Sequence, residues 1–421
     1  MTNLPQGWEV KKLEEIANIK GGKRLPKGKN LLDNNTKFAY IRVADFQDNG
    51  TINLQNIKFI NENTYNVLKN YKIYDDNLYI SIAGTIGKSG IIPKELNGAI
   101  LTENAVKLEY IQNNISNKFM YFFTLSNIFK TQIQTSTKIV AQPKLAITRL
   151  KQIQIPLPPL KEQERIVGIL DESFAKIDES IKILEQDLLN LDELMQSALQ
   201  KAFNPLKDNA KENYKLPQGW KWKSLGEICE ILGGGTPDTK NPIFWYSSQA
   251  DEVQFEKSYY WATLVDTKQK YLYGTKRKIT QKGLDCSNAI LLPINSVIFS
   301  SRASIGEISI AKVETATNQG YKNFICDESI LYYEFLYFAL KHFTKEIELL
   351  AQGTTYKEVS KAKIKDFKIP LPPLKEQEQI TKHLDFIFEK AKALKELYTK
   401  ELKDYEELKQ SLLDKAFKGE L

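Results

Sequence analysis

Two stretches of the chain repeat apolar residues every three or four positions, and acidic or amide residues fill the other faces. The first row contains Ile166, Leu170, Ile177, Leu184 and Leu191, and the second contains Ile380, Leu384, Leu394, Leu402 and Leu408. A mean spacing of about 3.5 residues, kept over several heptads, is typical of a coiled coil. Each stretch therefore predicts a long helix with one apolar seam. The simplest expectation is that the two predicted helices pack antiparallel, with each seam buried against the other.

The segment before each predicted helix has a different pattern. Short strand-like runs occur at 38–43, 78–82, 297–300 and 308–311, and helix-like runs occur at 117–130 and 332–350. The predicted fold class is therefore α+β, or mixed. Two globular domains of strands and short helices are expected to be separated by two long helices that form an antiparallel coiled coil.

Three motifs occur twice in the chain. Leu-Pro-Gln-Gly-Trp at 4–8 recurs at 216–220, the ten residues 155–164 recur without change at 369–378, and Lys-Ala-Phe at 201–203 recurs at 415–417. A period near half the chain indicates a duplicated unit, since solenoid repeats are much shorter. The expected division is a first globular domain at 1–155, a long helix at 156–203, a linker at 204–215, a second globular domain at 216–369 and a second long helix at 370–421.

Charge follows the same division. The whole chain has 59 Lys and Arg against 52 Asp and Glu. Residues 1–155 hold 21 basic against 12 acidic side chains, whereas residues 156–210 hold 6 against 11. Basic globular domains favour a polyanionic partner such as DNA, although a modest excess also occurs in proteins that need it only for solubility.

Several classes of protein are disfavoured. The three cysteines are widely spaced, which argues against a disulfide framework or a zinc site, and the two histidines have no set of neighbours suited to a metal or a triad. No apolar run is long enough to span a membrane, and the first residues do not resemble a secretory signal. A cytoplasmic protein is expected.

Two enzyme-like motifs are incomplete. Gly-Thr-Ile-Gly-Lys-Ser at 84–89 ends like a phosphate-binding loop, but Ile82 stands where the first glycine belongs. Asn-Pro-Ile-Phe at 241–244 is similar to the base-holding loop of amino-methyltransferases, but no glycine-rich cofactor turn is placed after a strand. No convincing nuclease cluster is present either. The prediction is a non-catalytic chain without a metal or cofactor of its own.

Taken together, the motifs resemble the specificity subunit of type I restriction–modification enzymes over nearly the whole chain. The resemblance rests on the two Leu-Pro-x-Gly-Trp entries and on the two Ile-Pro-Leu-Pro-Pro-Leu-x-Glu-Gln runs that open long helices. Shorter runs at 22–28, 41–46, 234–237 and 318–322 add to it.

The resemblance implies that each globular part is a target recognition domain that reads one half of a bipartite, asymmetric site in double-stranded DNA. The helix pair would set the gap and dock two adenine-N6 methyltransferase subunits, to which restriction and translocase subunits would be added. S-adenosylmethionine and ATP would be bound by those partners.

Candidate DNA-binding residues follow from loop position and side-chain chemistry. Arginine suits bidentate contact with guanine, lysine suits phosphate, and amide and hydroxyl groups suit base edges. In the first domain the candidates are Lys23, Arg24, Arg42, Lys88, Lys138, Gln142 and Lys144. In the second domain they are Arg277, Arg302, Gln319, Tyr321, Lys322, Gln352, Thr354, Thr355, Tyr356 and Lys357.

Two other functional classes stay open at this point. The helical seams would equally serve a coiled-coil protein scaffold that has no DNA specificity, and a self-sufficient enzyme would methylate DNA without partners. Retention of DNA on a filter tests the first alternative, and incorporation of labelled S-adenosylmethionine by the isolated chain tests the second.

Overall fold

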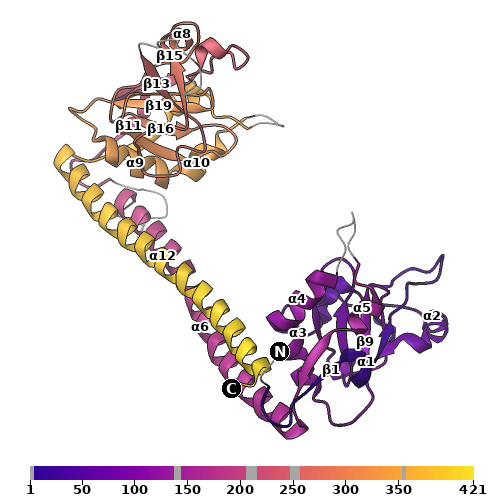
Figure 1. The fold of residues 1–421 in the computed structure, drawn as a ribbon. Coiled ribbons are helices and arrows are strands. Elements are labelled where there is room, and N and C mark those ends of the chain that lie inside the picture. Colours follow the sequence, from indigo (N-terminus) through magenta and orange to yellow (C-terminus); the bar gives the residue numbers. More distant parts are fainter. Residues whose placement is uncertain (1–3, 137–143, 205–215, 247–256, 353–356) are drawn as a thin grey trace. The chain divides into compact units, whose positions relative to one another are not determined.

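A computed structural model describes residues 4–136, 144–204, 216–246, 257–352 and 357–421. The chain divides into two compact units (Figure 1). The first unit contains residues 1–185 and 399–421, and the second contains residues 186–398. Each of the two long helices, α6 (Leu160–Phe203) and α12 (Leu374–Lys418), therefore contributes one segment to each unit.

The globular part of the first unit has a four-stranded antiparallel sheet, ordered β2-β9-β6-β7, and a four-stranded mixed sheet, ordered β4-β3-β8-β5. Helix α3 packs against β6 and β7. The strands are β1 (Glu9–Lys12), β2 (Ala17–Gly21), β3 (Ala39–Ile41), β4 (Lys58–Phe59), β5 (Lys72–Ile73), β6 (Leu78–Ser81), β7 (Ser89–Ile91), β8 (Ala99–Leu101), β9 (Ala105–Tyr110) and β10 (Gln154–Leu157). The helices are α1 (Leu13–Ile16), α2 (Glu62–Val67), α3 (Asn117–Leu125), α4 (Asn127–Ser136) and α5 (Ile147–Lys151).

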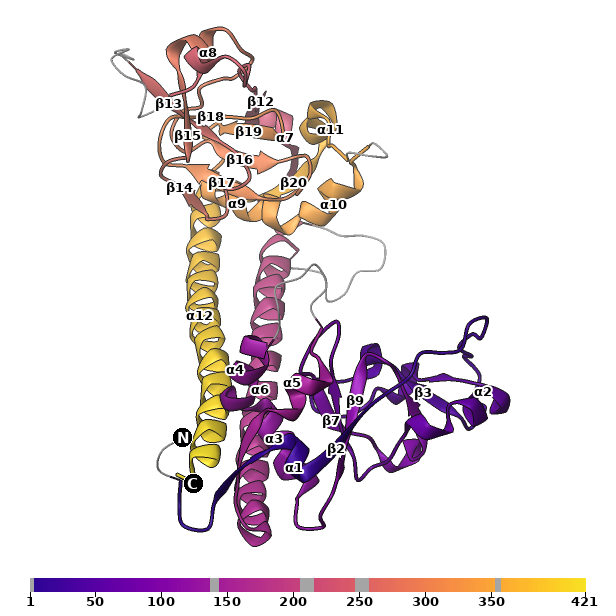
Figure 2. The same cartoon turned by 45° about the vertical axis from the view of Figure 1, so that its right-hand side comes forward.

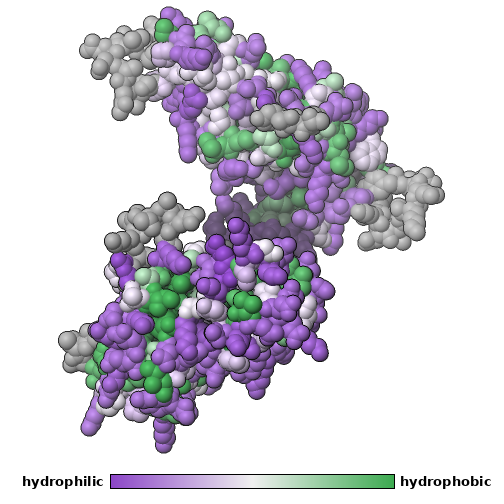
Figure 3. Space-filling model, turned by 90° about the vertical axis from the view of Figure 1, so that its right-hand side faces the viewer, coloured by the Kyte–Doolittle hydropathy of each residue, from purple (hydrophilic) through white to green (hydrophobic). Residues whose placement is uncertain are grey.

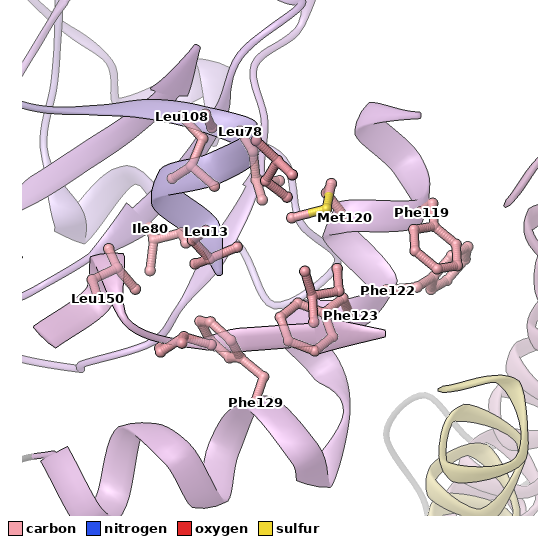
Figure 4. Packing of buried hydrophobic residues seen from close by; sticks show 14 of the residues in the cluster. Leu13, Leu78, Ile80, Leu108, Phe119, Met120, Phe122, Phe123, Phe129 and Leu150 are labelled. Atoms are coloured by element: carbon pink, nitrogen blue, oxygen red, sulfur yellow. The ribbon is translucent and has the colours of Figure 1, made fainter. Parts of the chain in front are cut away.

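The core of the first unit lies between its antiparallel sheet and helices α3 and α4. Figure 4 shows the inward residues of β6 and β9 near Met120, Phe123 and Phe129 of the two helices. Ile166 and Leu170 of α6 belong to the same buried cluster. The base of the long helix is therefore part of the domain core.

The second unit repeats this plan with a five-stranded sheet, ordered β12-β19-β16-β17-β14, and a three-stranded sheet, ordered β15-β13-β18 (Figure 2). Helix α9 packs on β16 and β17. The strands are β11 (Lys221–Ser224), β12 (Cys229–Gly233), β13 (Ser258–Ala262), β14 (Tyr271–Leu272), β15 (Arg277–Thr280), β16 (Val297–Ser300), β17 (Ile308–Ala311), β18 (Thr315–Thr317), β19 (Tyr321–Cys326) and β20 (Lys368–Leu371). The shorter helices are α7 (Leu225–Ile228), α8 (Gln281–Asp285), α9 (Tyr333–His342), α10 (Thr344–Leu349) and α11 (Lys361–Asp366).

The first repeated motif is a tight turn that leads into a paired strand. Gly7 and Gly219 have φ of 86° and 88°, a conformation that a side chain would strain. The turns are closed by Trp8 N donating to Pro5 O at 3.2 Å and by the equivalent bond of Trp220. The strands that follow, β1 and β11, pair antiparallel with β10 and β20 in the same register, which includes the repeated Ile-Pro-Leu residues. The first two repeated motifs therefore pack together in each unit, and they form the joint between the globular domain and its long helix.

A buried glutamine completes this joint in each unit. Gln163 is 1% exposed and Gln377 is 0% exposed. The Oε1 atom of Gln163 accepts the Ser116 N–H at 2.9 Å, and its amide nitrogen donates to the carbonyls of Asn114 and Pro158 at 3.2 and 2.9 Å. The same side chain recurs at the start of α12. A side chain near the start of each long helix thus satisfies backbone groups of the globular domain.

The third repeated motif fills a core across the duplication. Phe417, at the end of α12, packs its ring 5.1 Å from Phe119 and 5.5 Å from Phe123 in the first unit. Phe203, at the end of α6, lies 5.1 Å from Phe335 in the second unit and stacks on His342 at 5.3 Å. Each long helix thus starts on its own domain, and its last turn completes the core of the other copy's domain.

Within each unit the two helical segments run antiparallel. In the first unit Arg165 contacts the Leu421 carbonyl and Asp178 pairs with Lys409. In the second unit Asp192 pairs with Lys395. Among the predicted seam residues, Ile166, Leu170, Ile177, Leu184 and Leu384 are buried, whereas Leu191, Ile380 and Leu402 are partly buried.

Two of the seam predictions are wrong. Leu394 and Leu408 are 38% and 45% exposed, whereas Ala391 and Leu413 are buried. A straight helix drifts by about 20° per heptad relative to an exact seven-residue repeat, so not every apolar row on it can stay against the partner. In the part of the chain that the structure describes, no helix is both long and apolar enough to cross a membrane.

Candidate nucleic-acid interface

Most of the described candidates lie on loops near the β2–β9–β6–β7 sheet of the first unit and the five-stranded sheet of the second. In the first unit, Gly22 N donates to Ala105 O at 2.9 Å, Lys23 N to Leu101 O at 2.8 Å, and Leu145 N to Ile82 O at 2.8 Å. These backbone bonds tie together the loop after β2, the β6–β7 loop, the β8–β9 loop and the segment before α5. The cluster is therefore fixed by the sheet and does not depend on its own side chains.

The second unit builds the same cluster from diverged residues. Gly235 N donates to Thr317 O at 2.8 Å, Ser301 N to Gly320 O at 2.9 Å, and Val359 N to Ser301 O at 3.0 Å. The bonds join the loop after β12, the β16–β17 loop, the β18–β19 loop and the segment before α11. The same scaffold therefore presents different side chains in the two units.

One glycine in each cluster is required by close backbone approach. A Cβ atom on Gly22 would lie 2.0 Å from the carbonyl oxygen of Thr102, and one on Gly234 would lie 1.9 Å from that of Asn318. Neither position has room for a side chain. Each glycine thus allows one loop to pack closely against the next.

The incomplete phosphate-loop motif is a hairpin loop. Residues 84–88 connect β6 to its antiparallel neighbour β7, so no helix follows the loop to offer its N-terminus to a phosphate. Gly84 and its counterpart Ala303 have φ of 75° and 61°. This hairpin differs from the strand–loop–helix arrangement of a phosphate-binding loop.

Three candidates of the first domain come together in its loop cluster. Lys23, Arg24 and Lys144 are exposed, and the Arg24 Nε atom lies 2.6 Å from Glu103. Burial alone would raise the pKa of Glu103, but the hydrogen bond from Arg24 holds it below its ordinary value. The Arg24 side chain stays 79% exposed in this pair, so its other nitrogens can meet a partner.

Arg42 and Lys88 have other contacts. The Arg42 guanidinium donates to both carboxylate oxygens of Asp45, which is 1% exposed, and to the Asn56 carbonyl at 3.1 Å. Lys88 pairs with Asp48 at 2.8 Å. The structure thus gives Arg42 a supporting role in the first domain that competes with its predicted contact to a base.

Arg42→Ala is expected to destabilise the first unit by about 1–3 kcal/mol, because Asp45 would stay buried with its charge only partly compensated. Differential scanning calorimetry would report this as a lower melting temperature. The matched control is Arg24→Ala, since that ion pair is exposed and its removal is expected to leave the melting temperature almost unchanged. If Arg42→Ala instead changes the recognised half-site and leaves the melting temperature unchanged, Arg42 contacts a base as first predicted.

In the second unit Gln319 and Arg302 border one small pocket of about 160 Å³. The Thr236 hydroxyl hydrogen-bonds the exposed Gln319 side chain, which links the glycine loop to the β18–β19 loop. Arg302 and Gln352 both bridge to Glu358 through the backbone, and Lys357 is exposed beside them. Arg302, Gln319, Gln352 and Lys357 therefore lie on one connected set of loops.

Arg277 is held by two tryptophans beside this set. Its guanidinium carbon lies 3.7 Å from the ring centroid of Trp245 and 5.3 Å from that of Trp261. Trp261 in turn donates its indole N–H to the Gly235 carbonyl at 2.9 Å. The stacked guanidinium is exposed and oriented, which reduces the entropy lost when it forms a bidentate contact.

Two predictions in the second domain are wrong. Tyr321 is 1% exposed, its hydroxyl hydrogen-bonds Thr267 at 2.8 Å, and burial raises its pKa to about 12. Lys322 is 7% exposed and pairs with Glu358 at 3.0 Å and with the Ser301 hydroxyl at 3.1 Å. Both residues start β19, and other segments of the second unit, which include Thr267, Ser301 and Glu358, contact them. Neither can contact DNA in this structure.

The remaining candidates lie outside the described residues; they are Lys138, Gln142, Thr354, Thr355 and Tyr356. Within the described ranges, no group of three His, Cys, Asp or Glu side chains is placed to hold a metal ion. On the face shown in Figure 3, hydrophilic residues predominate and hydrophobic residues gather in small separate patches.

Comparison with known proteins identifies the duplicated architecture. The sequence profile described as type I restriction modification DNA specificity domain matches residues 5–188 and again residues 217–403. The chain belongs to this family. It carries two DNA specificity domains, each of which spans one globular part and much of the long helix that follows it.

Named relatives cover the whole chain. The putative type I restriction enzyme MjaX specificity subunit of Methanocaldococcus jannaschii is 23% identical over 99% of this chain and 94% of its own length. The EcoKI specificity subunit of Escherichia coli K12 is 24% identical over 99% of this chain and 90% of its own.

Solved structures share the fold of these specificity domains. A chain from a structure described as the basis of complex assembly and conformational transition of the type I R-M system has a TM-score of 0.78 at 22% identity and full coverage of both chains. The HsdS subunit of Thermoanaerobacter tengcongensis has a TM-score of 0.60 at 21% identity, over 100% of this chain and 98% of its own.

The sequence alone missed the residues that orient the specificity-domain candidates. Trp245 and Trp261 stack on Arg277, Glu103 pairs with Arg24, and Thr236 hydrogen-bonds Gln319. A signal existed for the tryptophans, because large aromatic residues in a polar, basic domain suggest a stacking role. Partners such as Glu103 lie 79 residues away along the chain and left no such signal.

Proposed function

We propose that this chain is the DNA-recognition subunit of a type I restriction–modification complex, in which each specificity domain reads one half of a bipartite, asymmetric site. The observation that carries the proposal is the double family match together with two loop clusters of common backbone and different side chains. Different side chains on one scaffold favour two different half-sites.

In this proposal the two long helices set the spacing between half-sites and dock two adenine-N6 methyltransferase subunits. Those subunits would bind S-adenosylmethionine, and restriction–translocase subunits would bind ATP. The chain itself would contribute recognition and positioning without catalysis. A scaffold without DNA specificity gains no support from the named relatives, which are restriction specificity subunits.

The deciding experiment is a genome-wide map of N6-methyladenine in cells that express this chain with its cognate methyltransferase subunit. A single two-part motif with a constant gap, lost when this chain is omitted, is the expected result. Methylation that ignores the presence of this chain would overturn the proposal. Methyl transfer to DNA by the isolated chain would overturn the part of the proposal that assigns no catalysis to this chain.

Arg277 offers a test of modular recognition. Arg277→Ala is expected to weaken binding by about 1–3 kcal/mol through one half-site only. Arg277→Lys keeps the charge but loses the planar fork, so it should relax that half-site while non-specific affinity is kept. The methylation map of each variant reports both halves at once, and Lys278→Ala, next along the strand, is the matched control. Equal relaxation of both halves would contradict independent reading.

A further inference from the structure

Two of the three cysteines face each other in the second unit. Cys229 begins β12 and Cys326 ends β19, and the antiparallel register places them directly opposite one another. Cys229 is buried, whereas Cys326 is partly exposed. Their separation along the sequence gave no hint of this arrangement, because the pairing arises only from the strand register.

The backbone pattern shows which kind of pair they form. Asp327 N donates to Ile228 O at 3.1 Å, so the next pair along the ladder is a hydrogen-bonded one. Hydrogen-bonded and non-hydrogen-bonded pairs alternate in an antiparallel ladder, which makes Cys229 and Cys326 a non-hydrogen-bonded pair. The Cα atoms of such pairs lie about 4.5 Å apart, within the range that a disulfide bridges.

The two sulfur atoms already interact. The neighbouring Cys326 thiol, together with burial, raises the pKa of Cys229 above its ordinary value. Cys229 therefore stays protonated while Cys326 is reduced. The more exposed Cys326 is the sulfur that a reagent in solution reaches first.

The first unit provides an internal comparison. The same ladder position there pairs Ala17 with Tyr110, and the neighbouring bond, Ile111 N to Ile16 O at 3.0 Å, repeats the backbone pattern. The duplicated fold thus forms this joint without sulfur. The fold itself therefore does not require cysteines at this pair of positions.

We propose that Cys229 and Cys326 are a redox-active pair that closes to an intrachain disulfide when the chain meets a small-molecule disulfide. Cys326 attacks the reagent as a thiolate, which forms a mixed disulfide and releases one thiol. Cys229 then loses its proton and attacks the Cys326 sulfur, which releases the second thiol. Two protein S–H bonds and the reagent S–S bond are lost, and one protein S–S bond and two small thiols are formed.

The cross-link would secure a strand that belongs to the candidate interface. Among the described strands, β12 lies at the edge of its sheet and pairs with β19 alone (Figure 2). Its far end leads into the glycine loop whose Thr236 contacts Gln319. Oxidation would therefore fix β12 to β19. The side chains of the loop that follows β12 would take no part in the disulfide.

The test uses the full-length chain and oxidised glutathione. After free thiols are blocked, mass spectrometry of the oxidised chain is expected to show the loss of two hydrogen atoms and a peptide that links residues 229 and 326. The melting temperature of the second unit should rise by roughly 5–10 °C and return to its starting value with dithiothreitol. Amide exchange in β12 should slow in parallel.

Matched variants separate the steps. Cys286→Ser removes the exposed third cysteine and should leave the cross-link intact. Cys229→Ser should stop the reaction at a glutathione adduct on Cys326, and Cys326→Ser should prevent it. If the wild-type chain keeps residues 229 and 326 as free thiols, or only accumulates adducts, the proposal is overturned. That wild-type result does not depend on how well any variant folds.

Discussion

Replacing Phe417 with alanine is expected to destabilise the first unit by about 3–5 kcal/mol. Phe417 lies four residues from the chain's last residue, yet its side chain is 1% exposed within a core built mainly from residues 13–170. The substitution removes a ring that contacts Phe119 and Phe123 and leaves a cavity between α3 and α12. The cost combines lost apolar burial with the unfilled cavity.

Hydrogen exchange is the sharpest measurement of this effect, because it resolves the units. Amides of α3 should lose protection in Phe417→Ala, whereas those of α9 in the second unit should keep theirs. Phe386→Ala on the same helix is the matched control, since that side chain is 61% exposed. Equal loss in α3 and α9, or no loss in α3, would contradict the proposed role of Phe417.

The second large effect is expected from Gln377→Met, at about 2–4 kcal/mol. Methionine has nearly the same length, but it leaves the Tyr332 N–H and the carbonyls of Ile330 and Pro372 without the bonds that Gln377 makes at 2.9 Å each. Unpaired backbone groups in a buried site cost more than the lost bonds themselves.

Calorimetry of the full chain checks this prediction as a fall in melting temperature of about 2–4 °C per kcal/mol. Gln379→Met, two residues further along α12 and exposed, should leave melting unchanged. Gln163→Met should lower the stability of the first unit instead. If Gln377→Met has the same melting temperature as the unchanged chain, Gln377 acts only by filling space.

Periodicity predicted much of the fold because burial repeats along the long helices and the central strands. The strands expected at 297–300 and 308–311 are β16 and β17, with the same bounds. The helical run expected at 117–130 is instead two helices, because Ser126 adopts an extended conformation and its hydroxyl caps Phe123. A capping serine inside an apolar run interrupts the helix without interrupting the hydrophobic pattern.

The candidate site was harder to predict, because side-chain exposure there depends on distant partners. Lys322 and Arg24 look alike in sequence, as basic residues next to glycine-rich turns. Strand β19 turns Lys322 toward Glu358, while the loop after β2 leaves Arg24 exposed. Asp45 is different, since it stands three residues after Arg42 in the same run and gave a local signal of an ion pair.

The exchange of Phe203 and Phe417 between the two copies has a consequence for the integrity of the molecule. Each unit contains segments from both sides of residues 205–215, so a single backbone cut there would separate neither unit into loose pieces. The two fragments would stay associated through two buried side chains, Phe203 at the end of α6 and Phe417 near the end of α12. The peptide connection between the two copies therefore adds to noncovalent contacts that already hold the copies together.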